Sequence, residues 1–298
     1  MIRHLRHNEI DKAAWDARLE RCPVRWWYGR SWVLDAACPG WEALVDEGSG
    51  AQMALPWRSR LGVRYLYQPF LLQRIGVFGG EPAPFLAAVP KAFRYADIYC
   101  NAGAPVASPP RMRITEQQNL ELDLGSPIEL LRAGYGENLR RNLRRPGAEV
   151  LRFEQGADVE VVLAFLKGSE QFRRWGIDRV RIACMERLLR GAMAHGEGRP
   201  FVMWHGEEPV AVAFLVEWGG RLIFLKGLAN SAGRGMRAMH HLLDRVIAQH
   251  AGRPLVLDLA GSNDAELARF YGGYGAHRTV YLRAVINRLP PLVRNLKP

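Results

Sequence analysis

The order of strand-like and helix-like segments after residue 198 constrains the fold of this chain more than any other feature of its sequence. Three apolar runs are separated by short Gly-containing turns, a pattern typical of antiparallel strands. The expected elements that follow one another are strands 200–204, 210–218 and 221–227, helix 235–250, strand 255–259, helix 264–272 and strand 277–284. This order predicts an α+β fold, because a Rossmann fold would alternate strands and helices strictly.

A domain boundary is predicted at Ser126-Pro127-Ile128-Glu129. The serine can cap a helix, the proline suits its first turn, and the glutamate completes a capping box. Because 298 residues exceed the usual size of one domain, we expect two domains, residues 1–125 and residues 126–298. Strand-like runs and short helices recur on both sides of this boundary. Each half is therefore expected to hold a mixed, mostly antiparallel sheet flanked by helices.

The positive charge of the chain is concentrated in its second half. The formal net charge is +11; residues 1–125 carry 15 Lys and Arg against 13 Asp and Glu, and residues 126–298 carry 26 against 17. A polyanionic partner is thus expected to bind residues 126–298. The alternative is a bias of composition, since 36 of the 41 basic residues are arginine.

A glycine-rich segment between strand 221–227 and helix 235–250 is the first candidate site. Small residues let the backbone turn sharply there, and the free N–H groups at the start of a helix attract anions. The residues assigned to donor binding are Leu225, Gly227, Gly233, Arg234, Gly235, Met236 and Arg237. The segment lacks the ending of a Walker loop and the glycine spacing of a dinucleotide fingerprint. The alternative is a plain glycine-rich connection.

The second candidate is the helix predicted at residues 264–272, which Asp264 or Asn263 can cap. Its Tyr271 lies near a helix terminus at an open sheet edge, where a phenol can deliver a proton to a leaving group. The alternative is a core aromatic residue whose hydroxyl binds a backbone carbonyl. Tyr271 is our candidate general acid.

Together these two segments resemble the GNAT acyltransferase superfamily. Its members hold the pyrophosphate of acyl-CoA in a Gln/Arg-x-x-Gly-x-Gly/Ala loop, and segment 233–235 stands where that loop should be. Members also show a Tyr followed four residues later by Gly-Phe, a spacing that Tyr271 and Gly275 keep. Two positions depart from the pattern: Asn230 replaces the Gln or Arg, and Ala276 replaces the Phe.

A closer resemblance, over nearly the whole chain, is to the FemAB-like or BioF2-like branch of this superfamily. Segment 135–145 resembles an Arg-rich helix of that branch, and segments 258–262 and 269–271 resemble its Asp-x-x-Gly-Ser…Arg-Phe-Lys/Tyr signature. The branch joins two GNAT-like halves, of which the second keeps the full site and the first is degenerate. The resemblance implies acyl-CoA or aminoacyl-tRNA as donor, and a cell-wall (peptidoglycan) precursor as one candidate acceptor.

The arginines of segment 135–145 form two ridges, because Arg140 and Arg144, and likewise Arg141 and Arg145, are spaced one helical turn apart. Like charges so placed repel, and a diphosphate, a CoA phosphate or a tRNA backbone would relieve the repulsion. We assign Arg140 and Arg144 to substrate binding. The alternative is a solvated helix face.

Four further residues complete the predicted site. Asp258, at a strand end, is a second catalytic candidate, for amine binding or as a base; otherwise it caps the turn at residues 261–262. Ser262, Lys226 and Trp175 are assigned to substrate binding, and Trp175 has the alternative of anchoring its helix to the core.

The remaining features exclude several other chemistries. The four cysteines are scattered, the adjacent His240 and His241 point apart on a helix, and neither pattern predicts a metal site. No signal peptide or membrane span is expected, so we expect a cytoplasmic protein. We therefore predict an N-acyltransferase that needs no covalent nucleophile, with tRNA as one candidate partner. The rival is a catalytically degenerate protein that binds RNA or an anionic precursor.

Overall fold

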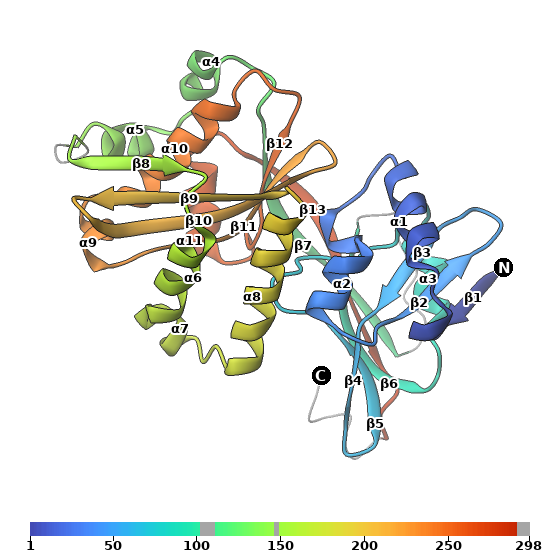
Figure 1. Ribbon diagram of the computed structural model, residues 1–298. Helices are drawn as coiled ribbons and strands as arrows, with labels where there is room; N and C mark the ends of the chain where they lie inside the picture. The colour runs from blue at the N-terminus through green and yellow to red at the C-terminus, as the bar shows by residue number, and fades with distance from the viewer. Residues whose placement is uncertain (102–110, 146–148, 291–298) are drawn as a thin grey trace. The chain divides into compact units, whose positions relative to one another are not determined.

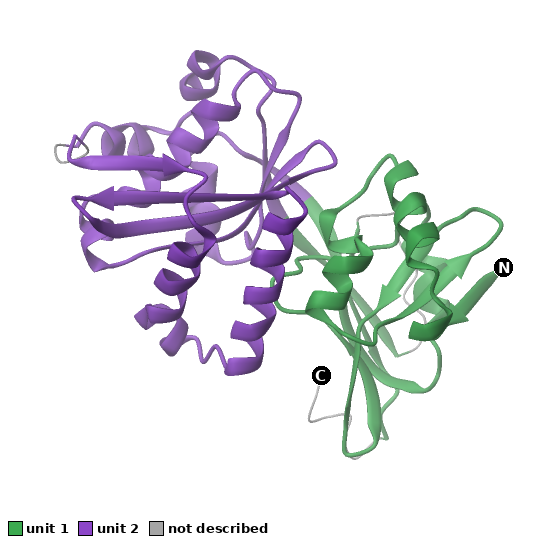
Figure 2. Ribbon diagram, viewed as in Figure 1, with its two compact units in different colours: residues 1–118, 280–298 green, residues 119–279 purple. Residues whose placement is uncertain are grey.

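A computed structural model describes residues 1–101, 111–145 and 149–290 (Figure 1). The chain divides into two compact units, residues 1–118 with 280–298 (unit 1) and residues 119–279 (unit 2) (Figure 2). These units differ from the predicted halves, 1–125 and 126–298, at both ends. The reason is that strands β7 (Met112–Asp123) and β13 (His277–Asn287) each carry the chain from one unit into the other.

Unit 1 holds two groups of strands around a core rich in tryptophan. Its elements are β1 (Ile2–Leu5), η1 (His7–Glu9), α1 (Lys12–Arg21), η2 (Trp27–Gly29), α2 (Ser31–Ala37), β2 (Glu42–Asp46), β3 (Gln52–Leu55), β4 (Trp57–Arg60), β5 (Val63–Tyr67), α3 (Pro82–Ala88) and β6 (Phe93–Asn101), with parts of β7 and β13. The strands β1, β2 and β3 form an antiparallel sheet, and the order of the second group is β4-β5-β6-β13. Trp15, Trp27 and Trp41 are fully buried.

Unit 2 holds the larger run of strands and most of the helices. Its elements are α4 (Ile128–Ala133), α5 (Glu137–Leu143), β8 (Leu151–Gln155), α6 (Val159–Gly168), α7 (Glu170–Arg174), α8 (Arg179–Ala194), β9 (Gly198–His205), β10 (Glu208–Trp218), β11 (Arg221–Ala229), α9 (Ser231–Gly235), α10 (Ala238–His250), β12 (Val256–Leu259) and α11 (Ala265–Gly272). Its strands follow the order β7-β12-β11-β10-β9-β8. Helices α6 and α8 pack on one face of this sheet, and α10 packs on the other (Figure 1).

The same strand pattern occurs once in each unit. In unit 1 an antiparallel pair, β4 and β5, is followed by the crossover helix α3 and by β6, which runs parallel to β5 and antiparallel to β13. In unit 2 the antiparallel pair β10 and β11 is followed by α10 and by β12, which runs parallel to β11 and antiparallel to β7. The predicted α+β class with two related halves is therefore confirmed. The closing strands are exchanged, because unit 1 is completed by β13, which follows all other elements of unit 2 in the chain, and unit 2 is completed by β7, which precedes them.

Several local predictions need correction. The capping box at Ser126 is wrong, because Pro127 occupies the N-cap position of α4 and no side chain caps this helix. The sequence predicts a helix over residues 127–145 that breaks near Gly134, and this break is confirmed, because Gly134 is the C-cap of α4 and α5 begins at Glu137. The sequence also predicts one helix over residues 158–174, which is instead divided into α6 and α7 where Ser169 caps α7. Strand β8 was not predicted, although Leu151 and Phe153 alternate with polar residues as in a half-buried strand. Among the described residues, the helices are all too short or too polar to span a lipid bilayer.

Candidate active site

In the sheet of unit 2, the parallel strands β11 and β12 separate part-way along β11. Strands β11 and β12 pair from Arg221 with Val256 to Ile223 with Asp258, and β11 then continues to Ala229 beside β10. In the described pairing, the edge of β11 that faces β12 thus has no partner strand over residues 224–229. An open edge exposes unpaired backbone N–H and C=O groups, so this part of the sheet can bind a ligand through its main chain.

The connection from β11 to α10 is shaped by one polar side chain and one strained residue. Asn230 caps the short helix α9, because its Oδ1 accepts a hydrogen bond from the Gly233 N–H at 2.8 Å. Arg237 then adopts a left-handed conformation, with φ at 58°, as the N-cap of α10. The cap explains why Asn suits position 230, where the GNAT pattern has Gln or Arg, since a short amide side chain is needed to reach back to the helix.

Two glycines of this connection differ sharply in their surroundings. A Cβ on Gly233 would lie 2.1 Å from the carbonyl oxygen of Val210, so any side chain would push α9 off β10. A Cβ on Gly235 would meet nothing within 4 Å. Gly233 is therefore needed for close packing, and Gly235 leaves the backbone open to an approaching ligand.

A pocket of about 230 Å³ lies beside the open edge of β11. It is lined by Gln171 of α7, Phe224, Gly227, Leu228 and Ala229 of β11, Arg234 of α9, Met239 of α10, and Leu267, Phe270 and Tyr271 of α11. The structure thus brings together the two predicted segments, which are far apart in the chain. Arg234 is held at the rim, where its Nη1 donates to the Ala229 carbonyl at 2.9 Å.

Tyr271 lies in the wall of this pocket. Its ring packs edge-on against Phe224, with 6.0 Å between centroids, and the residue is almost completely buried. Burial raises the pKa of Tyr271, so its hydroxyl stays protonated at ordinary pH. That hydroxyl forms no hydrogen bond within residues 1–101, 111–145 and 149–290. The alternative interpretation, a core tyrosine whose hydroxyl binds a backbone carbonyl, therefore does not describe Tyr271.

The neighbouring Tyr274, in contrast, is a core tyrosine whose hydroxyl has a hydrogen-bond partner. It is fully buried, and its hydroxyl donates to the backbone carbonyl of His240 at 3.1 Å. Its ring also packs edge-on against Tyr135. Of the two tyrosines, Tyr271 is therefore the one whose hydroxyl remains available to a ligand.

Lys226 and Trp175, which were both assigned to substrate binding, lie together. The Lys226 Nζ lies 4.5 Å from the centre of the Trp175 ring and 5.3 Å from that of Phe172. Trp175 is 52% exposed, so its predicted alternative as a core anchor does not describe it. Burial lowers the pKa of Lys226 to about 8.

Asp258 and Ser262 have structural partners. The Asp258 carboxylate accepts a hydrogen bond from the Asn119 Nδ2 at 2.7 Å and pairs with Arg221 at 3.4 Å. It is fully buried and joins β7, β11 and β12 rather than capping the turn at residues 261–262. The Ser262 hydroxyl donates to the Leu259 carbonyl at 2.6 Å. These contacts account for both side chains within the fold.

The remaining donor residues lie on both sides of the connection. Leu225 is buried at a β-bulge, where β11 has one residue more than β10. Met236 packs against the core beneath α10. The Arg237 Nη1 donates to the Arg234 carbonyl at 3.1 Å, and the buried Arg237 Nε has no partner among the described residues.

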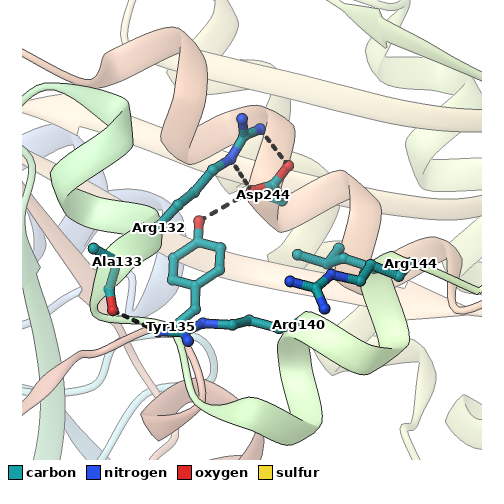
Figure 3. Close-up of a pocket in the computed structure, with 7 residues that line it drawn as sticks. Arg132, Ala133, Tyr135, Arg140, Arg144 and Asp244 are labelled. Carbon is teal, nitrogen blue, oxygen red and sulfur yellow. Dashed lines mark hydrogen bonds and ion pairs between the residues drawn. The ribbon is translucent and has the colours of Figure 1, made fainter.

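A second pocket, of about 440 Å³, is lined by the predicted arginines Arg140 and Arg144 (Figure 3). One wall is an ion pair in which Arg132 donates to both carboxylate oxygens of Asp244, at 3.0 and 2.7 Å. The Tyr135 hydroxyl donates to the same carboxylate at 3.1 Å. Burial raises the pKa of Tyr135, with the charge of Asp244 as the next cause, so this hydroxyl also remains protonated.

The arginines of α5 line an adjoining pocket of about 640 Å³ with Glu137. The Arg140 Nη2 donates to the Ala133 carbonyl at 2.6 Å, and the Arg141 Nη2 to the Asn138 side chain at 2.9 Å. Within the described part of the chain, Arg140, Arg141, Arg144 and Arg145 form no ion pair with a carboxylate. This cluster, which we call the α5 arginines, therefore favours an external anion over a face balanced by neighbouring acids.

Helix α5 and the β11 pocket are joined by a short series of contacts. The Asn142 Nδ2 lies 3.5 Å from the His240 Nε2, and the His240 ring packs edge-on against Phe270 at 4.9 Å between centroids. Phe270 in turn lines the β11 pocket. Burial, with the charge of Arg237 as the next cause, lowers the pKa of His240 to about 4, so its ring is neutral at ordinary pH.

Sequence reasoning missed several residues that shape these pockets. Gln171, Phe224 and Met239 line the β11 pocket, and Arg132 and Asp244 form a wall of the arginine pocket. Asp244 could have been noticed, because a carboxylate on the apolar face of helix 235–250 needs a buried partner. The others have no local signal, because they reach the pockets only through long-range packing. In the described part of the chain, no three His, Cys, Asp or Glu side chains group so as to hold a metal ion.

Comparison with known proteins agrees with this geometry. Residues 132–269 match the family described as "Acetyltransferase (GNAT) domain". The matched residues lie within unit 2. No curated protein sequence matches it significantly.

Solved structures share the fold of the chain over nearly its whole length. FemX superposes with a TM-score of 0.65 at 12% identity, over 97% of this chain and 99% of FemX. A tandem GNAT protein from the clavulanic acid biosynthesis pathway superposes with a TM-score of 0.54 at 12% identity, over 97% and 99% of the two chains. L-PGS from Bacillus licheniformis superposes with a TM-score of 0.51 at 12% identity, over 96% and 95%. At these identities the likeness establishes the fold alone, which consists of two GNAT-like halves.

Proposed function

We propose that this protein is an N-acyltransferase that transfers an acyl or aminoacyl group from a CoA- or tRNA-linked donor to the amine of an anionic acceptor. The observation that carries the proposal is the β11 pocket, in which Gly227, Arg234 and Tyr271 meet at an open strand edge. A pocket that contains both an anion-binding connection and an unpartnered phenol suits a reaction in which a charged donor loses a leaving group.

The connection between β11 and α10 suits the phosphate groups that both kinds of donor carry. The first N–H groups of α10 have no partner within the helix, and the helix dipole adds positive potential at the same end. Arg234 and Arg237 stand beside this terminus. The open space at Gly235 lets a phosphate approach the backbone closely.

The reaction needs alignment and charge stabilisation more than a special nucleophile. The neutral amine attacks the carbonyl carbon of the donor, and N–H groups on the open edge of β11 can stabilise the oxyanion that forms. Tyr271 is the proposed acid that gives its proton to the departing thiolate or ribose oxygen. A protonated, unpartnered hydroxyl in the pocket wall is suited to this step.

The α5 arginines support an acceptor that is itself anionic. Arg140 and Arg144 line both arginine pockets, and each guanidinium can bind a phosphate or carboxylate through two parallel N–H groups. A nucleotide-linked cell-wall precursor combines phosphates with a free amine, and we propose it as the first acceptor to test.

The proposal is tested by product formation. The full-length protein is incubated with acetyl-CoA, longer CoA esters or aminoacyl-tRNA, and with amine acceptors that include nucleotide-linked muropeptides; acylated acceptors are then measured by mass spectrometry. An amide product whose formation needs the protein is expected. Donors that bind should also raise the melting temperature, since a ligand at 100 times its Kd adds about 2.7 kcal/mol to the free energy of unfolding.

A protein that binds RNA or an anionic precursor without catalysis is the second candidate, which the unpaired α5 arginines favour. The unpartnered Tyr271 hydroxyl argues against it, because a protein that only binds has no use for a buried acid beside an open strand edge. Stabilisation by tRNA or muropeptides, with no product from any donor, would select this second function.

A further inference from the structure

We propose that the β11 pocket binds an apolar acyl group of about six to eight carbons, carried as a CoA thioester, in preference to an aminoacyl group. The inference rests on the acyl transfer proposed above. The proposed acid Tyr271 and the open edge of β11 meet in this pocket. The reacting carbonyl group is therefore expected here, and the substituent on its carbon must occupy the space that remains.

The walls of the pocket are mostly apolar. Helix α11 presents one face to it, because Leu267, Phe270 and Tyr271 are spaced three and four residues apart. The rings of Phe270 and Tyr271 lie 5.4 Å apart between centroids, and Tyr271 packs edge-on against Phe224. The apolar lining is completed by Leu228, Ala229 and Met239. Carbon atoms therefore surround most of a group that enters the pocket.

The charges around the pocket are unfavourable for the ammonium of an aminoacyl group. Among the described residues that line it, no aspartate or glutamate occurs, and the one charged side chain is the guanidinium of Arg234. Two acids precede lining residues in the chain. Glu170 pairs with Arg174 at 3.3 Å, and Glu266 is exposed and lies about 100° around α11 from Leu267. An ammonium in the pocket would thus lose its water without gaining a carboxylate, which is costly.

The size of the pocket sets the length of the acyl group. Its volume is about 230 Å³, and a water molecule, which is close in size to a methylene group, takes up roughly 30 Å³ in the liquid. The space therefore holds roughly seven groups of that size. An acetyl group would leave most of it to water in contact with apolar walls, which is unfavourable.

Binding of CoA esters to the full-length protein tests the acyl group without turnover. Acetyl-, butyryl-, hexanoyl-, octanoyl- and dodecanoyl-CoA are titrated calorimetrically in the absence of an acceptor. Each methylene that becomes buried should lower Kd about fourfold, so Kd should fall about 10²-fold from acetyl-CoA to hexanoyl-CoA and stop falling beyond about eight carbons. β-Alanyl-CoA, which has an ammonium where butyryl-CoA has a methyl group, should bind more than about tenfold more weakly than butyryl-CoA.

Two variants test whether the pocket itself selects the length of the acyl chain. Leu267→Trp adds a ring at a residue that is 41% exposed, so it should fill the pocket without disturbing the core and should remove the gain in affinity beyond butyryl-CoA. Met239→Ala shortens a side chain that lines the pocket and should move the tightest binding to longer acyl chains. Leu130→Trp, at an exposed residue of α4 that does not line the pocket, is the matched control and should keep the wild-type Kd for every ester.

The same esters and aminoacyl-tRNA are then compared in the acylation assay, which separates this inference from the proposed function. Equal Kd and equal kcat/KM for all CoA esters would show that the pocket holds only the pantetheine arm, and the inference would be overturned while the acyltransferase stood. Faster turnover with aminoacyl-tRNA than with hexanoyl-CoA, or equal binding of β-alanyl-CoA and butyryl-CoA, would overturn it in the same way. Binding that depends on acyl length, with no product from any donor, would support the acyl pocket and refute the acyltransferase.

Discussion

The two units contain the same parallel strand pair, but it is closed in one and open in the other. In unit 1, β5 pairs with β6 from Arg64 up to Tyr67, the last residue of β5. In unit 2, β11 leaves β12 after Ile223 and continues to Ala229. A parallel pair that stays hydrogen-bonded to its end leaves no space for a ligand between its strands. The topology is thus shared, whereas the opening that can hold a donor is formed in unit 2.

The crossover segments of the two units differ in the same direction. Unit 1 returns through α3, a seven-residue helix with Pro82 in its first turn. Unit 2 returns through a glycine-rich connection and the thirteen-residue helix α10, whose N-terminus faces the opening. Function in repeated folds depends on such local differences rather than on the fold itself. The comparison is the reason that we place the proposed site in unit 2.

The largest effect is expected from the tyrosine pair beside the opening. Tyr271→Phe removes a hydroxyl but keeps the ring against Phe224, so kcat should fall by about 10²–10⁴-fold while stability changes little. Turnover and thermal unfolding are measured on the same variant. Normal turnover in Tyr271→Phe would remove this residue from the reaction and weaken the contrast between the units.

Tyr274→Phe is the matched control for this test. Its hydroxyl donates to the His240 carbonyl, so its loss should lower the free energy of unfolding by about 0.5–1.5 kcal/mol. The rate should remain near that of the wild type. If the two variants exchanged these effects, the assignments of the catalytic and the structural tyrosine would have to be exchanged as well.

A smaller effect is expected from reversing the charge of the α5 arginines. The double variant Arg140→Glu with Arg144→Glu should raise the KM for an anionic acceptor about 10–100-fold, since a charged hydrogen bond contributes about 1.5–3 kcal/mol. The dependence of KM on salt should also decrease, because fewer ions are released on binding.

The control for this variant lies in unit 1. Arg60→Glu with Arg94→Glu changes the net charge by the same amount on exposed residues of β4 and β6. It should leave the KM unchanged. Equal effects of the two double variants on KM would mean that acceptor binding depends only on the net charge of the protein. The α5 arginines would then be a solvent-exposed helix face with no role in binding.

The smallest effect concerns His240 on the long crossover helix of unit 2. Because burial lowers the pKa of His240 to about 4, the unfolded chain binds a proton below about 6.5 that the folded chain does not. Stability is therefore fully present above pH 6.5 and is lost as the pH falls toward 4. In His240→Gln the free energy of unfolding should fall less steeply between pH 6.5 and pH 4, as measured by urea unfolding at several pH values. An unchanged pH dependence would contradict the burial of a neutral ring.

Much of the fold could be predicted from periodicity and turn residues. Strands expected at residues 200–204 and 210–218 appear as β9 and β10 with ends displaced by up to two residues, and the cap of α11 at Asp264 is confirmed. The exchange of β7 and β13 could not be predicted, because the pairing of residues 120–123 with β12 joins positions more than a hundred residues apart. Local sequence patterns contain no information on which distant strand becomes a neighbour.

The candidate site was predicted as two separate segments, but its environment was not. Glycine spacing and Tyr271 indicated the donor connection and the acid, since both depend on local backbone geometry. The available hydroxyl of Tyr271, the ring partners of Lys226 and the ion pair that holds Asp258 depend on contacts between distant elements. Burial and charge at a site follow from tertiary packing, and a single sequence does not show them.

The central claim is that one acyl donor binds at the open pair of unit 2, and the stoichiometry of donor binding tests it most directly. Isothermal titration with the donor that supports turnover should give one site per chain. Gly233→Ala, which forces a Cβ against the Val210 carbonyl, should abolish binding, and Gly235→Ala, which fills the space open to a phosphate, should weaken it. The unit 1 variant Gly80→Ala, whose Cβ would lie 2.8 Å from that of Ala51, should retain binding. Two sites per chain, or wild-type binding by Gly233→Ala, would contradict the account.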